Sequence, residues 1–299
     1  MVIPANQLLT WSNIGAEVTS AAAYASVQNA LRVGAPTAAL GLDVFLQGSY
    51  ANHTQIRADS DVDIVALYDR TVINDVDRLP PAAGQAIRAA GGVADYPWAA
   101  LKEDLLRSLR LQYANVRIGT KTLKVVAPNG REVDVLPAIQ FDLYDGRHYG
   151  LLGYQPISGI AFFDHNGSRV VNYPKQHREN GSAKNDLLRT GQNYKPTVRI
   201  FKNLRNHLVA LNRLPAGTAP SYFIEGMLWN VPDALFFGPF EESIWAIITH
   251  LVQTPFNTMM CQNDIVPLFG PDPTQWHDAD FTTFIMTARN AWLNWNAWN

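Results

Sequence analysis

The stretch 48-GSYANHTQIRADSDVDIVAL-67 places a glycine-serine pair a dozen residues before two aspartates, Asp61 and Asp63, which a single valine separates. The run 61-DVDIVALY-68 alternates and is rich in β-branched side chains, which predicts a β-strand. In a strand, residues i and i+2 share a face, so the two carboxylates project together. Like charges this close repel each other, and folding alone gives no reason for the pair. The pair therefore indicates a function.

A third acid, Asp134, lies in another predicted strand, 131-REVDVLPAIQF-141. If that strand lies beside the first, the three carboxylates converge on one edge of a sheet. Oxygen ligands suit Mg²⁺, and two ions about 3.5–4 Å apart can clamp an in-line phosphoryl displacement. The alternative is that Asp134 is a solvated residue on an exposed strand face. Together with the upstream pair, we favour a site for two Mg²⁺ ions, which Mn²⁺ can replace.

Gly48 and Ser49 suit an anion next to this metal site. A glycine turn lets backbone N–H groups approach an anion closely, and the serine hydroxyl adds a donor. A helix beginning near Ala51 would favour phosphate at its N-terminus. A glycine-serine pair alone carries no signal, but its spacing from Asp61 and Asp63 is specific.

The composition fits a cytoplasmic globular protein. The 299 residues are 47% hydrophobic and carry a formal net charge of −2, so no general attraction to nucleic acid or membrane is expected. The single cysteine, Cys261, excludes an intramolecular disulfide and favours a reducing compartment. The sequence shows no signal-peptide pattern at its start and no run of about 18 apolar residues.

The pattern along the chain predicts an α+β protein of two lobes. We expect an α/β lobe with a mixed sheet over 1–150, a mainly helical lobe over 151–299, and an active site in the cleft between them. An Asn-Gly turn at 129–130 predicts a hairpin, and residues 145–196 look irregular. The expected strands are 42–49, 61–68, 115–127 and 131–141, and the expected helices are 5–32 (spanning both lobes), 98–113, 197–212, 221–230, 240–253 and 280–298.

Gly-Ser, then Asp-x-Asp on a strand, then a distant Asp resemble the signature of the DNA polymerase β-like nucleotidyltransferases. More narrowly, the chain resembles the bacterial cGAS/DncV-like nucleotidyltransferases of the E clade, the CdnE enzymes. The resemblance covers nearly the whole chain, and its motifs are 46-LQGSYANHTQIRADSDVDIVAL-67, 171-VNYPKQHRENGSAKN-185, 194-YKPTVRIFKNLRNHL-208, 220-PSYFIEGMLWNVPD-233 and 261-CQNDIVPLFG-270. It implies a polymerase-β-like lobe packed against a C-terminal helical lobe of the OAS/cGAS kind.

The resemblance implies a cyclic dinucleotide synthase of an anti-phage (CBASS) defence system. Such an enzyme joins two NTPs, releases pyrophosphate, and makes a product that activates a separate effector protein. It implies ATP and UTP as substrates, and both cyclic UMP-AMP and a cyclic dipyrimidine such as cyclic di-UMP fit. We expect a monomer with neither a nucleic-acid activator nor a membrane partner.

The resemblance also assigns residues. It makes Asp61, Asp63 and Asp134 catalytic and metal-binding, with Asp134 rather than His177 activating the attacking hydroxyl. Asn172, just before Tyr-Pro-Lys, stands where asparagine accompanies pyrimidine use, because its amide matches the O4 and N3–H edge of uracil. The nucleotide-binding residues it implies are Gln47, Gly48, Ser49, Asn172, Lys202, Ser221 and Tyr222.

Each of these residues also has a plain structural interpretation. Lys202, beside Arg199, would otherwise be a charge on a solvated helix face. Ser221 is a plausible helix N-cap, and Tyr222 would otherwise pack in the core. Asn172 would otherwise be a turn residue. Three tryptophans near the C-terminus, at 292, 295 and 298, are expected to pack the last helix onto its lobe rather than to dock a partner.

Two rival functions stay open at this point. The first is a nucleotidyltransferase that modifies a separate acceptor: an RNA 3′ end, an antibiotic or a protein. The second is an inactive nucleotide-binding scaffold, against which the three intact acids argue.

Overall fold

The computed structural model describes residues 2–15, 18–57, 61–91, 96–271 and 275–298. Within it the chain divides into two compact units. The sheet unit comprises Glu17–Gln47 and Ser60–Pro174, and the helical unit comprises Met1–Ala16, Gly48–Asp59 and Lys175–Asn299. The expected division at 150 differs from this one, because two strands of the sheet follow that residue and two short N-terminal segments belong with the C-terminal helices.

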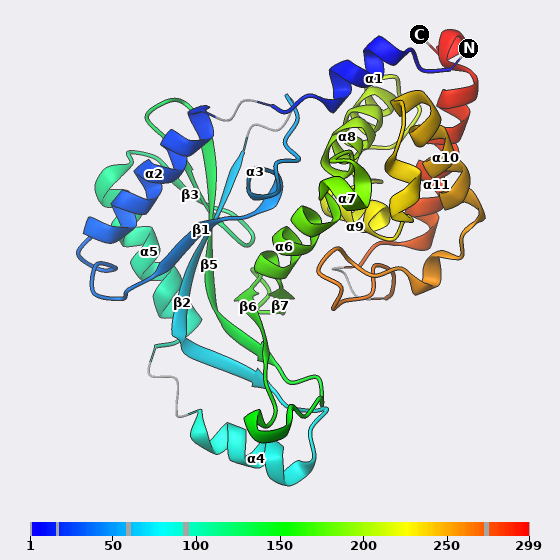
Figure 1. Ribbon diagram of the computed structural model, residues 1–299. Coiled ribbons are helices and arrows are strands. Elements are labelled where there is room, and N and C mark those ends of the chain that lie inside the picture. The colour runs from blue at the N-terminus through cyan, green and yellow to red at the C-terminus, as the bar shows by residue number, and fades with distance from the viewer. Residues whose placement is uncertain (1, 16–17, 58–60, 92–95, 272–274, 299) are drawn as a thin grey trace. The chain divides into compact units, whose positions relative to one another are not determined.

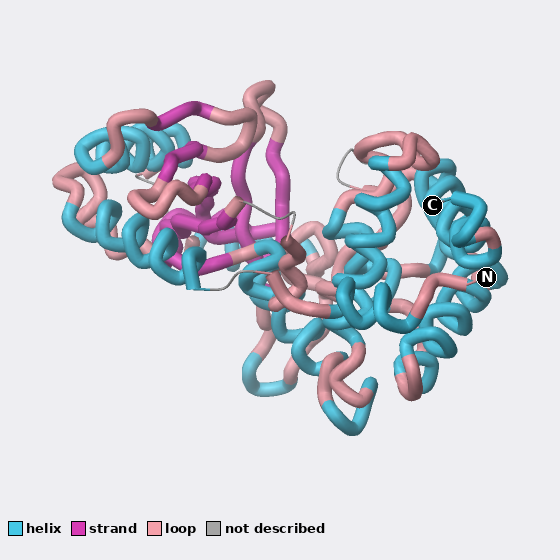
Figure 2. Tube along the Cα trace, turned by 90° about the horizontal axis from the view of Figure 1, so that it is seen from above, coloured by secondary structure: helices cyan, strands magenta, loops and turns pink. Residues whose placement is uncertain are grey.

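The sheet unit is built on one mixed sheet of seven strands in the order β1-β2-β5-β4-β3, with β6 beside β5 and β7 beside β6. The strands β2 and β5 run parallel, and every other pairing is antiparallel. The strands gather into one group (Figure 2). Their bounds are β1 Asp43–Leu46, β2 Val62–Asp75, β3 Val116–Ile118, β4 Leu123–Val126, β5 Glu132–Leu143, β6 Ile157–Phe163 and β7 Arg169–Asn172.

The long strand β5 contains a proline near its middle, which is unusual because proline lacks the N–H that a sheet needs. On one side of β5, β4 pairs as far as Val135, and β6 begins to pair at Ile139. Pro137 lies between these two pairings, and its carbonyl accepts a hydrogen bond from Trp98 Nε1 at 2.8 Å. The proline therefore falls where the sheet changes partners.

The helices of the sheet unit are α2 Val18–Val33, α4 Pro81–Ala90 and α5 Trp98–Gln112. The helices α2 and α5 lie side by side (Figure 1), and a hydrogen bond of 2.7 Å joins Ser26 of α2 to the hydroxyl of Tyr113 just after α5. The apolar side chains of β5 and of β2 from Val62 to Leu67 are buried, so the sheet supplies a rigid support for the polar residues near the start of these strands.

The helical unit packs its helices around a large apolar core. Trp292 and Trp295 are buried in that core and Trp298 packs against it, which confirms the expected packing of the last helix. The helices are α1 Ala5–Ser12, α3 Gly48–Asn52, α6 Pro174–Lys184, α7 Leu187–Thr190, α8 Tyr194–Ala210, α9 Ser221–Trp229, α10 Phe240–Gln253, α11 Asp278–Leu293 and α12 Trp295–Trp298. Among the described residues, no helix is both long and apolar enough to cross a membrane.

Several expectations about secondary structure are wrong. The strand expected over 115–127 is the antiparallel pair β3 and β4, and the helix expected over 280–298 is divided into α11 and α12. The helix expected over 5–32 is two helices, because α1 ends at Ser12 and Asn13 is extended. A side chain at Gly15 would meet the carbonyl oxygen of Ile56 at 2.8 Å, so the chain must pass close to another segment there. The region 145–196, expected to be irregular, contains β6, β7, α6 and α7.

Candidate active site

The acids of the sheet unit lie at the start of its parallel strand pair. Asp63 on β2 and Asp134 on β5 are direct register partners, as the sequence predicted for neighbouring strands. Val62 and Ile64 are fully buried while Asp63 is half-buried, so the carboxylate points to the opposite, more open face. The backbone N–H of Gln47 donates to the Asp63 carbonyl at 2.9 Å, which puts the end of β1 beside the same acid.

Lys124 of β4 is the register partner of Asp134 on its other side. Its Nζ lies 3.0 Å from Asp134 Oδ2, and the Thr122 hydroxyl donates to the same oxygen at 3.3 Å. The hydrogen bond to Asp134 raises the pKa of the Lys124 ammonium, and the charge of Asp61 adds to this shift. Lys124 thus neutralises part of the acid cluster.

The other oxygen of Asp134, Oδ1, is buried and has no hydrogen-bond partner in the described part of the chain. A buried carboxylate oxygen without a donor costs about 1–3 kcal/mol, and a hard cation would satisfy it. No three His, Cys, Asp or Glu side chains among the described residues are placed to hold an ion directly. The carboxylate oxygens fit a divalent metal ion, which would take the place of the Lys124 ammonium beside Asp134.

Gly48 and Ser49 begin the short helix α3 in the helical unit, slightly earlier than the start expected near Ala51. Gly48 has φ +67°, a left-handed conformation that glycine adopts without strain. Gly48 is exposed and Ser49 is half-buried, and the Ser49 carbonyl accepts from the Thr54 N–H at 2.9 Å. We call residues 48–54 the Gly-Ser turn.

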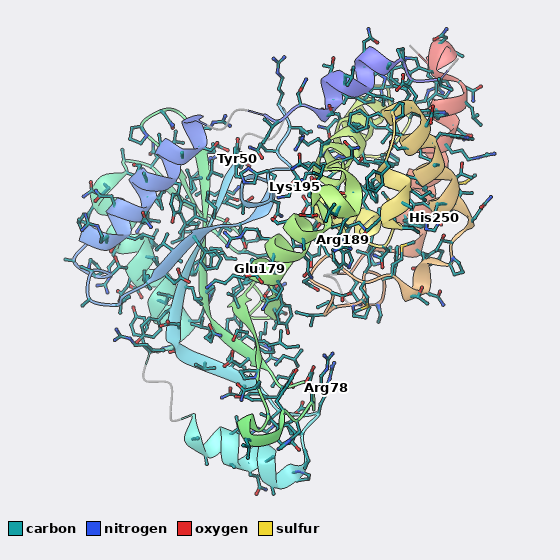
Figure 3. The ribbon with its side chains drawn as sticks, viewed as in Figure 1. Tyr50, Arg78, Glu179, Arg189, Lys195 and His250 are labelled. Carbon is teal, nitrogen blue, oxygen red and sulfur yellow. The ribbon has the colours of Figure 1, made fainter. Side chains whose placement is uncertain are left out.

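The helix α8 holds the Gly-Ser turn with two cations. Lys202 is fully buried, and its Nζ donates to the Thr54 carbonyl at 2.9 Å. Arg199 donates to the His53 carbonyl at 2.6 Å and to the Ser12 carbonyl at 2.6 Å. A solvated helix face is therefore wrong for Lys202, because two segments distant in sequence cover that side of α8. Figure 3 labels Lys195, which lies on the same helix about one turn before Arg199.

Ser221 is the first residue of α9 and not its N-cap, which is Pro220, so the capping interpretation is wrong. Its hydroxyl accepts from Arg205 Nη1 at 3.3 Å. Tyr222 is partly buried against the core, with its ring stacked on His177 at a centroid distance of 5.2 Å. Asn263 Nδ2 donates to the Tyr222 hydroxyl at 3.1 Å, so this ring is held in one orientation.

Asn172 is the last residue of β7, not a loop residue, and it belongs to the same sheet as the acids. Its Oδ1 accepts from the Tyr173 N–H at 2.8 Å, which fixes the carboxamide plane. An amide oxygen has two acceptor directions, so this bond still leaves one for a ligand.

Comparison with known proteins agrees with this geometry. A family model described as the cGAS/DncV-like nucleotidyltransferase C-terminal helical domain matches residues 179–293. A Rhodothermus marinus protein named cyclic UMP-AMP synthase is 38% identical, with 99% of each chain covered. A Staphylococcus haemolyticus protein named cyclic nucleotide synthase CdnE01 is 33% identical, with 99% of this chain and 100% of that protein covered. The solved structure of the Rhodothermus marinus CdnE c-UMP-AMP synthase with Apcpp and Upnpp superposes with a TM-score of 0.88 at 37% identity, covering 98% of this chain and 97% of that one.

The chain belongs to the cGAS/DncV-like nucleotidyltransferases, in their CdnE branch. The resemblance inferred from the sequence is thereby confirmed, as are the α+β fold with its C-terminal helical domain and the activity class of a nucleotidyltransferase.

Sequence reasoning missed two charged residues of this CdnE chain. Lys124 carries no motif, but its place opposite Asp134 follows from the Asn-Gly hairpin that the sequence does predict. Glu225 lies inside the apolar run of α9, where a lone acid was the available signal. It is buried among partners from two segments, the Gly-Ser turn and α6.

Proposed function

We propose that this CdnE nucleotidyltransferase joins two NTPs, at least one of them UTP, into a cyclic dinucleotide. The observation that carries the proposal is the register of Asp63 opposite Asp134, with Lys124 beyond it. The names of the relatives support cyclisation, and Asn172 on the same sheet supports a pyrimidine. Cyclic UMP-AMP and a cyclic dipyrimidine both fit.

In the proposed reaction the 3′-hydroxyl of one nucleotide attacks the α-phosphorus of another (some relatives use the 2′-hydroxyl). A new O–P bond forms, the bond to the β-phosphate oxygen breaks, and pyrophosphate leaves. Asp134 takes the proton of the attacking hydroxyl. The linear dinucleotide then turns around and closes by the same step, with a second pyrophosphate released.

Asp61, Asp63 and Asp134 would hold two Mg²⁺ ions, or Mn²⁺ in their place. When bound, such ions neutralise the charge that develops on the attacking and leaving oxygens. Gln47, Gly48, Ser49, Lys202 and Ser221 would orient the donor triphosphate, and Tyr222 would stack on a base. Lys202 would act indirectly, by holding the Gly-Ser turn in place through its hydrogen bond to the Thr54 carbonyl.

The wider role is part of the same proposal. We infer that the enzyme works in the cytoplasm as a monomer and that its product activates a separate effector in anti-phage (CBASS) defence. Membership of the CdnE branch supports this role.

The chemistry is tested by paired substitutions on β5. Asp134→Asn removes the proposed base, and we expect pyrophosphate release from NTPs without any acceptor to fall at least a hundredfold. Asp142→Asn is the matched control, because Asp142 lies on the same strand but bonds Ser158 and Gln140 instead. Equal activity of the two variants would contradict the role of Asp134.

A further inference from the structure

Glu225 is a buried carboxylate that the proposed reaction does not use. Its side chain is 5% exposed, and both of its oxygens are occupied. The Thr54 hydroxyl donates to Oε1 at 2.7 Å, while Asn52 Nδ2 at 3.1 Å and His177 Nε2 at 2.6 Å contact Oε2. A buried charge is tolerated when it is fully hydrogen-bonded, so these partners are fixed with respect to one another.

On one side, Glu225 fixes the Gly-Ser turn. Asn52 is the last residue of α3, and Thr54 bonds back to the Ser49 carbonyl. His53, between them, has φ +54°, a conformation rare for a residue with a side chain. Such a conformation persists only where the surroundings impose it. The hydrogen bonds that Asn52 and Thr54 donate to Glu225 help to impose it here, together with the bond from Arg199 to the His53 carbonyl.

On the other side, Glu225 fixes the ring that lies under Tyr222. His177 stacks on Tyr222 with an interplanar angle of 19°. His177 Nδ1 has no hydrogen-bond partner in the described part of the chain, so the bond from Nε2 to Glu225 is what orients the ring there. A shift of the carboxylate would therefore move the His177 ring that supports one face of Tyr222.

We propose that Glu225 is a positioning residue that couples the Gly-Ser turn, which would bind phosphate, to Tyr222, which would stack on the base. The inference rests on the proposed function for the roles of Ser49 and Tyr222. It makes one carboxylate responsible for the spacing between the two ends of a bound nucleotide within the helical unit.

The test is the variant Glu225→Gln, which keeps the shape but removes the charge and leaves one acceptor oxygen for the three partners Thr54, Asn52 and His177. We expect the Kd for a non-hydrolysable UTP analogue, measured by isothermal titration calorimetry with Mg²⁺, to rise about tenfold. Its KM for NTPs should rise in parallel while the melting temperature stays well above the assay temperature. The control is Glu179→Gln on the exposed surface of α6 (Figure 3), for which no change is expected.

A second variant, Thr54→Val, serves if Glu225→Gln does not fold. It removes the hydroxyl that donates to Glu225 and keeps the side-chain volume nearly constant. It should raise the same Kd about threefold. In the double variant the two effects on the Kd should be less than additive, because Thr54 and Glu225 share one hydrogen bond. A purely structural role would lower the melting temperature of the variants without raising the Kd. Unchanged Kd values in Thr54→Val, or in folded Glu225→Gln, would overturn the proposal. A wild type that binds the analogue but makes no cyclic product would reject the proposed function and leave this inference to be judged by the Kd alone.

Discussion

At the scale of single residues, buried cations of the helical unit serve as internal clamps. Lys184 is 2% exposed, and its Nζ donates to the Trp229 carbonyl at 2.8 Å, the Val231 carbonyl at 2.7 Å and Asp233 Oδ1 at 2.9 Å. Burial lowers the pKa of this ammonium, which the partner Asp233 only partly offsets. Lys184 and Lys202 each hold a backbone segment in place by donating hydrogen bonds to its carbonyl groups. In a buried environment these charged hydrogen bonds replace the bonds that water would make.

The thiol of Cys261 offers a test of burial at this scale. It is 1% exposed, and burial raises its pKa to about 11, against a smaller lowering by the Tyr222 hydroxyl. A raised thiol pKa leaves the neutral form dominant until the pH approaches 11, so the reactive thiolate is scarce at pH 8. We expect native protein to react with Ellman's reagent at least a hundredfold more slowly than urea-unfolded protein. Cys261→Ser is the blank, and a native rate close to the unfolded one would contradict the buried thiol.

The sequence could not reveal these clamps, although it predicted that Asp63 and Asp134 lie on neighbouring strands. Asp61, Asp63 and Asp134 follow from strand alternation, which is local. The local pattern predicts a solvated Lys202, because the apolar stripe of its helix lies on a different face from Lys202. Its burial depends on the Gly-Ser turn, about 150 residues away in sequence, and no local period records such a contact.

At the scale of elements, the Gly-Ser turn depends on the backbone of Gly48. A side chain at its φ of +67° costs about 1–2 kcal/mol. Gly48→Ala should therefore lower the free energy of unfolding by about 1 kcal/mol and, by shifting Ser49, reduce product formation at least tenfold. Urea denaturation and initial rates measure the two effects.

Gly217→Ala is the matched control for this element. Gly217 has φ +86° with nothing within 4 Å of an added Cβ, so it carries the same strain away from the proposed site. We expect a similar loss of stability with unchanged activity. Equal losses of activity in both variants would mean that the Gly-Ser turn has no special role.

Elements with a clear local period were predictable, and those set by distant partners were not. The strand 61–68, the helix 98–113 and the Asn-Gly hairpin are confirmed, because each buries one regular apolar pattern. The strands β6 and β7 were not predicted. The strand β6 pairs with Ile139 to Leu143 of β5, and this pairing depends on a contact with another segment and not on a local pattern. The length of β5 could have indicated a further strand, because β4 pairs only with its first part.

At the scale of the whole molecule, the chain passes between its two units more than once. Segments near the N-terminus and the Gly-Ser turn belong with the C-terminal helices, so no single boundary separates the units. Trp11 of α1 packs edge-on against Trp295 of α12 at 5.7 Å, which joins the two ends of the chain in one core. The expectation of a site in a cleft between two lobes stays a prediction.

The most direct test of the central claim is a reaction of purified enzyme with all four NTPs and Mg²⁺, repeated with Mn²⁺. Each NTP carries a radioactive α-phosphate in turn, and products are treated with phosphatase and identified by mass. We predict a phosphatase-resistant cyclic dinucleotide labelled from UTP. Resistant product labelled from purines alone would remove the role of Asn172. No resistant product, with label transferred to added RNA instead, would contradict the claim that this enzyme is a cyclase.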